Sequence, residues 1–280
     1  MDDAAPHFSK GQRKIAAYIR EHYDKAAFMT AFKLGTTVGV SESTVVRFAT
    51  EIGYDGYPQL QKALQEMIRN RLTSVQRMEV AHQRLEGGDV LTKVLQTDIE
   101  TLKRTIEEMD RSMFQAAVQY ITHAQRIYIM GIRSSSALSN FLSYYFTQIF
   151  EHVRHIDTSS TSMIFEQMMR LTDGDVFIGI SFSRYSKRTL KAAEFAKACG
   201  ARVVAITDSM SAPIASVADS VLVAKSDMAS FVDSLVAPLS VINALIVAIG
   251  VERNEEISDI YRKLETIWEE YNVYEKDSDA

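Results

Sequence analysis

The sequence predicts two domains, an all-α head followed by an α/β body built around a doubly wound, five-stranded parallel sheet. The chain has 280 residues, which is more than one small domain requires. Residues 8–73 show helical periodicity, whereas five short runs rich in Val and Ile alternate with helical segments from residue 126 onward. Such runs suit strands buried on both faces, and their alternation with helices is typical of a parallel sheet with right-handed crossovers.

The expected domain boundaries follow composition and charge. We expect the head to span residues 1–77, a polar linker to span 78–90, and the body to span 91–280. Lys and Arg outnumber Asp and Glu by five between residues 8 and 77, although the whole chain has a net charge of -5. A basic domain on an acidic chain is expected where only one domain meets a polyanion.

Composition excludes several classes of protein. Hydrophobic residues make up 46% and charged residues 24%, which argues against disorder. Cys199 is the single cysteine, so an internal disulfide framework and a multi-cysteine zinc site are excluded. No apolar leader opens the chain, no glycine-rich nucleotide loop occurs, and the most apolar stretch, 235–251, is shorter than a membrane span needs. We expect a cytoplasmic protein without a metal or cofactor.

The head begins with two predicted helices. Ser9 is suited to cap the first, whose apolar positions recur at helical spacing at Ile15, Tyr18, Ile19 and Tyr23. The second is expected over residues 30–37, and its predicted buried side consists of Phe32, Leu34 and Val38. A further helix is expected from Tyr57 to Thr73, after the breakers at residues 53–58.

A tight turn and a third helix follow the first two. Gly39 stands where a turn between helices needs a residue tolerant of positive φ, and Ser41 is suited to cap the next helix. In that helix Val45, Phe48 and Ile52 face inward, and Val40 fills the corner before it. Ser43, Thr44 and Arg47 remain on the outside near its start. This is the pattern of a helix-turn-helix, whose second helix presents its N-terminal residues to base edges.

The predicted DNA contacts of this segment are Ser41, Ser43, Thr44, Arg47 and Tyr54. The alternative is a helical corner that touches no DNA. In that case Arg47 pairs with Glu51 four residues on, and Ser43 and Thr44 serve only the helix start.

The body contains the predicted strands. They cover residues 126–130, 153–156, 175–181, 201–207 and 220–224, and the connections at 134–150, 160–171, 186–199 and 212–218 are helical or polar. Three strands end in hydroxyl-rich segments, at 134–136, 158–161 and 181–186. Each segment also opens a helix, where free N–H groups and the helix dipole favour an anion.

These segments predict an effector site for a phosphorylated or acidic polyhydroxy ligand. We expect it to include Ser134, Ser135, Ser136, Ser181, Ser183, Arg184 and Ser186. Arg133 and Arg184 either contact the ligand or narrow its site. The alternative for any single segment is a plain helix cap. No catalytic residues are predicted, since Glu166 and Glu194 are better explained as solvated helix positions than as general bases.

Helices elsewhere in the body favour self-association. Asp89 is suited to cap a helix through Met109 with apolar positions at Leu91, Leu95, Ile99, Leu102 and Ile106. The segment 255–271 carries a single apolar stripe that suits its own domain or a partner helix, and the predicted helix 232–251 is mostly apolar. The segments 232–251 and 255–271 together predict a homodimer.

Several of these motifs resemble a known family. VSESTVVRF at residues 40–48, with GY at 53–54 and YP at 57–58, resembles the helix-turn-helix of RpiR-type bacterial regulators. GIRSS at 131–135, SFSRYS at 181–186 and residues 201–219 resemble the sugar isomerase (SIS) domain of that family. The resemblance implies a homodimeric or homotetrameric regulator of sugar or amino-sugar metabolism that binds an operator in double-stranded DNA and answers to a sugar phosphate. It also implies ligand contacts at Ser134, Ser135, Ser181, Ser183 and Ser186.

The sequence departs from that family at two points. Many SIS domains have Gly where Arg133 and Arg184 stand, and Tyr185-Ser186 replaces a more frequent acidic residue and Thr. Three alternatives follow: the ligand is an unusual phosphosugar, it is another anion, or the domain has lost small-ligand binding. Two other functions stay open from the residues alone: a phosphosugar isomerase with an accessory helical domain, and a phosphosugar sensor that contacts protein.

Overall fold

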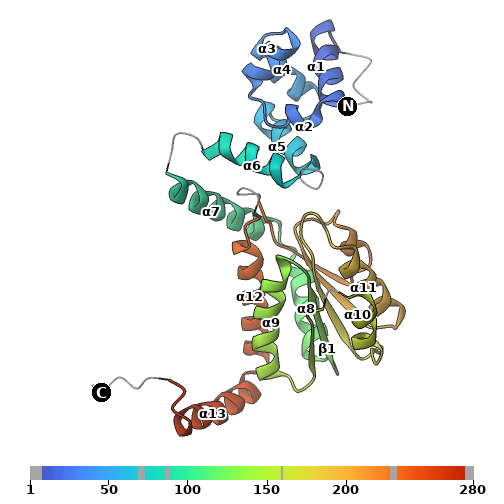
Figure 1. The fold of residues 1–280 in the computed structure, drawn as a ribbon, viewed down its shortest axis with the longest axis vertical. Coiled ribbons are helices and arrows are strands. Elements are labelled where there is room, and N and C mark those ends of the chain that lie inside the picture. Colours follow the sequence, from blue (N-terminus) through green and yellow to red (C-terminus); the bar gives the residue numbers. More distant parts are fainter. Residues whose placement is uncertain (1–7, 69–72, 86–88, 159, 228–231, 275–280) are drawn as a thin grey trace, which may run out of the picture. The chain divides into compact units, whose positions relative to one another are not determined.

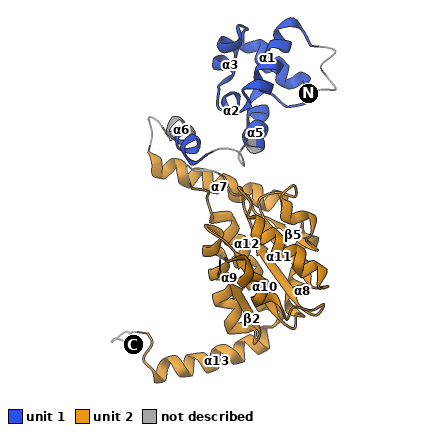
Figure 2. Cartoon of the chain, turned by 45° about the vertical axis from the view of Figure 1, so that its right-hand side comes forward, with its two compact units in different colours: residues 1–88 blue, residues 89–280 orange. Residues whose placement is uncertain are grey.

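A computed structural model describes residues 8–68, 73–85, 89–158, 160–227 and 232–274 of the chain. It divides into two compact units, residues 1–88 and 89–280 (Figure 2). Within the predicted linker 78–90, residues 78–85 belong to a helix of the first unit and Asp89 caps the first helix of the second.

The first unit is entirely helical in its described part (Figure 1). Its helices are α1 (Lys10–Glu21), α2 (Tyr23–Ala26), α3 (Ala31–Val38), α4 (Glu42–Glu51), α5 (Tyr57–Ile68) and α6 (Ser74–Leu85). Ser9 caps α1 in a reciprocal capping box with Gln12, as its sequence predicts. Tyr57 of α5 donates a hydrogen bond of 2.7 Å to the carbonyl of Met29, which ties α5 to the turn before α3.

The core of this unit gathers the apolar faces of its helices. Fully or almost fully buried side chains include Phe8, Ile15, Ile19, Leu34, Val45, Phe48, Leu60 and Leu64. The prediction that Phe32 is buried is wrong, because its side chain is 66% exposed. Phe32 lies two positions from Leu34, about 200° away around the helix, and therefore on the opposite face. Val38 is half-buried.

The second unit is an α/β domain whose described strands form a five-stranded, all-parallel sheet in the order β2-β1-β3-β4-β5. The strands are β1 (Ile127–Gly131), β2 (Val153–Ile156), β3 (Val176–Ile180), β4 (Arg202–Thr207) and β5 (Ser220–Val223), each within one residue of its prediction at either end. The helices are α7 (Val90–Glu108), α8 (Arg111–Thr122), α9 (Ser135–Ile149), α10 (Thr161–Met168), α11 (Lys187–Ala198), α12 (Val236–Glu252) and α13 (Asn254–Glu270), with a 3₁₀ turn, η2 (Pro213–Ser216).

Helices cover both faces of this sheet (Figure 1). Buried residues of α8, α9 and α12 pack on one face, and those of α10, α11 and η2 pack on the other. Strands β1 and β3 are buried along their whole length. That burial explains why their sequences are continuously apolar.

The last two helices differ in burial. α12 is buried along one side by Ala237, Val241, Ile242, Leu245 and Ile249, whereas no residue of α13 is buried. No single described helix is both long and apolar enough to cross a bilayer; α12 and α13, bent by 101° at their junction, pass that test only as a pair.

Candidate functional site

The first candidate site is the outer side of α4. Gly39 has φ +70°, the left-handed conformation that lets α3 end and the chain turn sharply. The N–H of Val40 donates to the carbonyl of Gly35 at 2.9 Å, which closes the turn. The hydroxyl of Ser41 accepts from the N–H of Thr44 at 3.3 Å and so caps α4. The turn and cap are those that the sequence predicts.

The predicted DNA contacts fall into two groups. Ser41, Ser43, Thr44 and Arg47 lie at or near the start of α4, and the side chains of Ser43 and Arg47 are exposed. The hydroxyl of Ser41 lies 2.9 Å from that of Ser43 and 2.8 Å from that of Thr44, and Arg47 Nε donates to the carbonyl of Ser43 at 3.3 Å. Tyr54 is half-buried beyond the other end of α4 and is not grouped with them.

A polar groove runs between the start of α1 and this side of α4. It has a volume of about 570 Å³ and is lined by Ser9, Gln12, Thr44, Arg47, Thr50 and Glu51. Glu51 therefore lines the same groove as Arg47, with which it was expected to pair if this segment touches no DNA. Gln12 and Thr50 were not predicted as site residues, because their contribution depends on how α1 packs against α4.

The second candidate site is the carboxyl edge of the sheet. The strand order reverses direction at β1, which lies between β2 and β3, and ligands of such sheets bind at this switch point. The predicted hydroxyl-rich segments follow β1, β2 and β3, so they stand at three adjacent strands. Gly131 of β1 pairs with Ile180 of β3, and the loops after these two residues are neighbours.

The loop after β1 turns tightly into α9. A Cβ atom on Gly131 would lie 2.4 Å from the carbonyl oxygen of Ser135, so glycine is required where the helix returns over the strand. Arg133 has φ +62°, and its carbonyl accepts a hydrogen bond of 2.6 Å from the hydroxyl of Ser136. Ser134 is exposed and Ser135 is buried. The N–H of Ser136 donates to the carbonyl of Arg133 at 3.0 Å, so this helix start offers a ligand the exposed Ser134 side chain and the N–H of Ser135, the first residue of α9.

The loop after β3 is held by its own serines. The hydroxyl of Ser181 accepts from the N–H of Ser186 at 3.2 Å, and the hydroxyl of Ser186 caps α11 by accepting from the N–H of Thr189 at 3.2 Å. A hydroxyl that accepts a hydrogen bond still has a proton to donate, so Ser181 and Ser186 are suited to bind an anion. Arg184 has φ +59° in the same loop.

Strand β4 adds a residue that the sequence analysis missed. Asp208, directly after β4, accepts a hydrogen bond of 2.8 Å from the hydroxyl of Tyr185 and is almost fully buried. This contact joins the loop after β3 to the end of β4. An Asp directly after a predicted strand was the available signal.

The segment after β2 contributes less. The hydroxyl of Thr158 accepts from the N–H of Ser160 at 3.1 Å, and the hydroxyls of Ser160 and Ser162 lie 3.1 Å apart. These residues are engaged with one another at the start of α10. Ser159, in the same predicted segment, lies outside the described residues.

His155 is a second residue that the sequence analysis left without a role. It lies in β2, with Nε2 3.0 Å from the hydroxyl of Ser139 on α9. Burial lowers the pKa of His155 below its ordinary value, and the nearby Asp157 carboxylate opposes that shift. Burial at this place, on the strand beside β1, therefore favours the neutral form of the imidazole.

The residues considered for catalysis are separate from this arrangement. Glu166 on α10 and Glu194 on α11 are both exposed on the surfaces of their helices. Among the described residues, no group of three His, Cys, Asp or Glu side chains is arranged to hold a metal ion.

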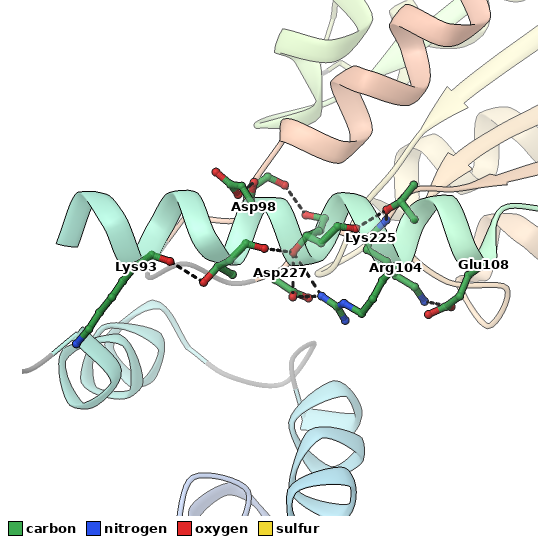
Figure 3. A network of polar contacts seen from close by, with 11 residues as sticks. Lys93, Asp98, Arg104, Glu108, Lys225 and Asp227 are labelled. Carbon is green, nitrogen blue, oxygen red and sulfur yellow. Dashed lines mark hydrogen bonds and ion pairs between the residues drawn. The ribbon is translucent and has the colours of Figure 1, made fainter. Parts of the chain in front are cut away.

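A polar network joins α7 to the segment that follows β5 (Figure 3). Arg104 forms an ion pair with Asp227, and the hydroxyl of Thr101 donates to the same carboxylate at 3.1 Å. The N–H of Lys225 donates to the hydroxyl of Thr105 at 2.9 Å, and its ammonium lies 2.5 Å from the Glu108 carboxylate. We call these six residues the α7 clasp: Thr101, Arg104, Thr105, Glu108, Lys225 and Asp227.

The family is decided by both halves of the chain. The helix-turn-helix domain of the rpiR family matches residues 2–71, and the SIS domain matches residues 120–248. The chain belongs to the RpiR-type transcription regulators. A helix-turn-helix regulator of Haemophilus influenzae is 28% identical to this regulator over 261 residues, covering 89% of this chain and 88% of the relative. One from Clostridium perfringens is 24% identical and covers 75% of each chain.

Solved structures agree with this assignment. The sugar isomerase domain of an RpiR transcription factor from Sphaerobacter thermophilus matches with a TM-score of 0.60 and 28% identity, over 62% of this regulator and 97% of that chain. The Vibrio vulnificus NanR protein, solved in complex with ManNAc-6P, matches with a TM-score of 0.59 and 24% identity over 93% of both chains. At that identity the match to NanR shows a shared fold.

Proposed function

We propose that this regulator binds operator DNA through the start of α4 and that a sugar phosphate at the carboxyl edge of the sheet changes its DNA affinity. One observation carries the proposal: a capped recognition helix and hydroxyl-rich loops at a topological switch point occur in one RpiR-type chain. The first suits a DNA groove and the second suits a phosphate.

The DNA contacts divide by chemistry. Arg47, exposed about one and a half turns into α4, is suited to a bidentate contact with a guanine edge. Ser43 and Thr44 are short donors near the same end, and Ser41 adds a hydroxyl at the cap. Tyr54, beyond the far end of α4, suits a phosphate contact.

The effector contacts come from the loops after β1 and β3. Ser134, Ser181, Ser183 and Ser186 supply hydroxyls, while the buried Ser135 and the hydrogen-bonded Ser136 place the N–H groups at the start of α9. Arg184 supplies a cation beside them. The sugar phosphate bound by NanR, which shares this fold, supports a ligand of the same class.

The regulator acts as a homodimer or larger homo-oligomer in this proposal. The apolar stripe of α7 is exposed, with Leu91 66% and Ile106 63% accessible, and α13 has no buried residue. A second copy of the chain covers such faces. Two heads then read two half-sites, so a small change in their spacing alters DNA affinity.

A phosphosugar isomerase is the rival function. It needs a general base over the sugar, and Glu166 and Glu194 are exposed on helix surfaces. We expect no turnover of any sugar phosphate, and turnover that is lost on Glu166→Gln or Glu194→Gln would support the rival.

The proposal is tested by fluorescence anisotropy of the full chain with its own upstream intergenic DNA. A salt series with and without a panel of sugar phosphates is expected to give steeply salt-dependent binding that one phosphosugar shifts. Absence of duplex binding under every condition would overturn the DNA-binding part.

Arg47→Ala tests the recognition helix. We expect it to weaken specific operator binding by roughly 1–3 kcal/mol, since it removes a base contact. Lys25→Ala, which removes one positive charge from an exposed position on α2, is the matched control. If both variants lose the same amount of operator affinity, Arg47 contributes only its positive charge and makes no specific base contact.

Ser183→Ala combined with Ser186→Ala tests the effector site. We expect loss of the phosphosugar response with unchanged operator affinity, because both serines lie in the loop after β3. A parallel loss of DNA binding would mean that these serines support the fold.

A further inference from the structure

The two loops of the effector site carry arginines in a conformation that side chains avoid. Arg133 has φ +62° and Arg184 has φ +59°. Among the described residues, the other non-glycine residue with positive φ is Asn272, near the C-terminus. A Cβ atom makes this conformation costly, because it approaches the neighbouring carbonyl oxygen. Glycine would remove that cost at either position, yet both positions hold a cation.

Both arginines belong to one place in the fold. Gly131 and Ile180 are register partners on the neighbouring strands β1 and β3, and Arg133 and Arg184 follow them by two and four residues. Both side chains are exposed at the carboxyl edge. They therefore flank the switch point from its two sides.

The surroundings of these arginines are already positive. The two loops and the first turns of α9 and α11 contain four cationic residues and no acidic one: Arg133, Arg184, Lys187 and Arg188. The start of a helix carries partial positive charge, so cations there repel it. The neighbouring strand ends add Asp157 and Asp208, and Asp208 accepts a hydrogen bond from Tyr185. The loops retain an excess of positive charge.

We propose that the effector is a phosphosugar with a second anionic group, and that Arg133 and Arg184 select for that group. The inference rests on the proposed function, since it concerns the ligand of the same site. The serine hydroxyls and helix N–H groups bind one anionic group without a charge of their own, and the guanidinium groups bind the other. The second group is a phosphate or a carboxylate, because both accept paired N–H donors from guanidinium.

Calorimetric titration of the full chain with matched sugars tests this inference. Each sugar of a panel from three to seven carbons is offered as its monophosphate, as its bisphosphate and as its phosphorylated acid. We expect a doubly anionic form to bind at least about tenfold more tightly than the matching monophosphate, as charge-assisted hydrogen bonds require. The bisphosphate and phosphorylated-acid arms distinguish phosphate from carboxylate as the second group.

Arg133→Gly combined with Arg184→Gly is the decisive variant. Glycine adopts positive φ without strain, so the loops keep their conformation, and an undiminished melting temperature checks the fold. We expect the preference for the doubly anionic form to disappear, so that the ratio of its affinity to that of the matching monophosphate falls to about one. Arg154→Ala combined with Arg170→Ala removes the same charge beside the groove at the amino ends of β1 and β2, and is expected to keep the preference.

The outcomes separate the two proposals. Equal binding of singly and doubly anionic sugars by the natural chain would overturn the inference and leave the proposed function standing. A preference that survives Arg133→Gly and Arg184→Gly would also overturn it. Failure of every sugar phosphate to bind would overturn both the inference and the effector part of the proposed function.

Discussion

Helices α4 and α7 are both amphipathic in sequence, but they use their apolar faces differently. α4 buries Val45, Phe48 and Ala49 in the core of its own unit. α7 instead buries Thr101 and Thr105, which are 1% and 4% exposed, and leaves most of its apolar stripe accessible. Its polar contacts within the unit include the α7 clasp and a hydrogen bond from the hydroxyl of Ser234 to Asp98.

α4 thus completes the core of its own unit, whereas most of the apolar face of α7 is left exposed by the described residues. Threonine hydroxyls are buried in α7 because each is hydrogen-bonded: the single proton of the Thr101 hydroxyl lies within reach of both the Asp227 carboxylate and the Thr97 carbonyl, and Thr105 accepts from Lys225. The exposed leucine and isoleucine side chains support the proposed second copy of the chain. Apolar periodicity alone does not tell these two uses apart.

Phe48→Ala is expected to have the largest effect, because it empties the core under α4. We expect a loss of about 3–5 kcal/mol in the stability of the head, as for other buried phenylalanines. Hydrogen exchange of the α1 and α4 amides reports it. Phe32→Ala, at the exposed aromatic position of α3, is the matched control and is expected to change stability by less than about 0.5 kcal/mol.

Asp227→Ala breaks the α7 clasp and is expected to have the next largest effect. It leaves Thr101 and Arg104 without their shared acceptor, and the loss is about 1–3 kcal/mol. Exchange of the α7 amides measures it. The matched control is Asp259→Ala, which removes an exposed ion pair with Arg262. A clasp variant as stable as this control would show that α7 is held by its few apolar contacts.

Ser41→Ala removes the cap of α4 and is expected to destabilise the head by about 1 kcal/mol. The N–H of Thr44 loses its acceptor. Ser41→Gly is expected to cost only a few tenths of a kcal/mol, since glycine suits the cap position. Equal effects of the two substitutions in urea unfolding would mean that the cap hydrogen bond contributes little.

Ile99→Ser combined with Ile106→Ser acts on the exposed stripe of α7. Within one chain we expect a change below about 0.5 kcal/mol, because neither side chain is buried. Light scattering is expected to show that the molecular mass falls from a multiple of 31.5 kDa in the natural protein to the 31.5 kDa of a single chain in the variant. If the variant keeps the mass of the oligomer, the interface lies elsewhere on the chain. If the natural chain is itself a monomer, the proposed homo-oligomer is wrong.

The N-terminal caps of α4 and α7 are expected to respond differently to acid. Hydrogen bonds from the Thr92 side chain, from its N–H and from that of Leu91 lower the pKa of Asp89, whereas Ser41 is uncharged. The stabilising effect of the Asp89 carboxylate is therefore present above its unfolded pKa and is lost as the pH falls through the lower folded pKa. We expect Asp89→Asn to reduce the acid sensitivity of α7, measured by exchange of its amides. An identical pH profile in this variant would contradict the prediction.

Much of the fold could be predicted because its signals are local. Ser9, Ser41 and Asp89 cap the helices that they were expected to cap, and Gly39 takes the positive φ that its turn requires. The strands coincide with the apolar runs because strands buried on both faces need continuous Val and Ile. Phe32 was misplaced because a short helix with two apolar faces does not say which one the core covers.

The candidate site was predicted in its hydroxyls but not in its supporting residues. The serine clusters are visible as sequence motifs at strand ends, whereas Asp208 and His155 gain their roles from Tyr185 and Ser139, on other elements. Their contacts depend on which strands are neighbours. Proposed roles for the site residues remain predictions that the titrations above address.

By itself, the sequence determined the two-domain organisation, the helix caps, the positions of the strands and the motifs of an RpiR-type regulator. Only the tertiary structure decided the strand order that brings Gly131 beside Ile180, the face that α7 buries, and the two arginines at positive φ. The physical reason is range. Caps, turns and periodicity depend on residues that are a few positions apart in the sequence. Strand order and burial depend on contacts between residues that are far apart in the sequence.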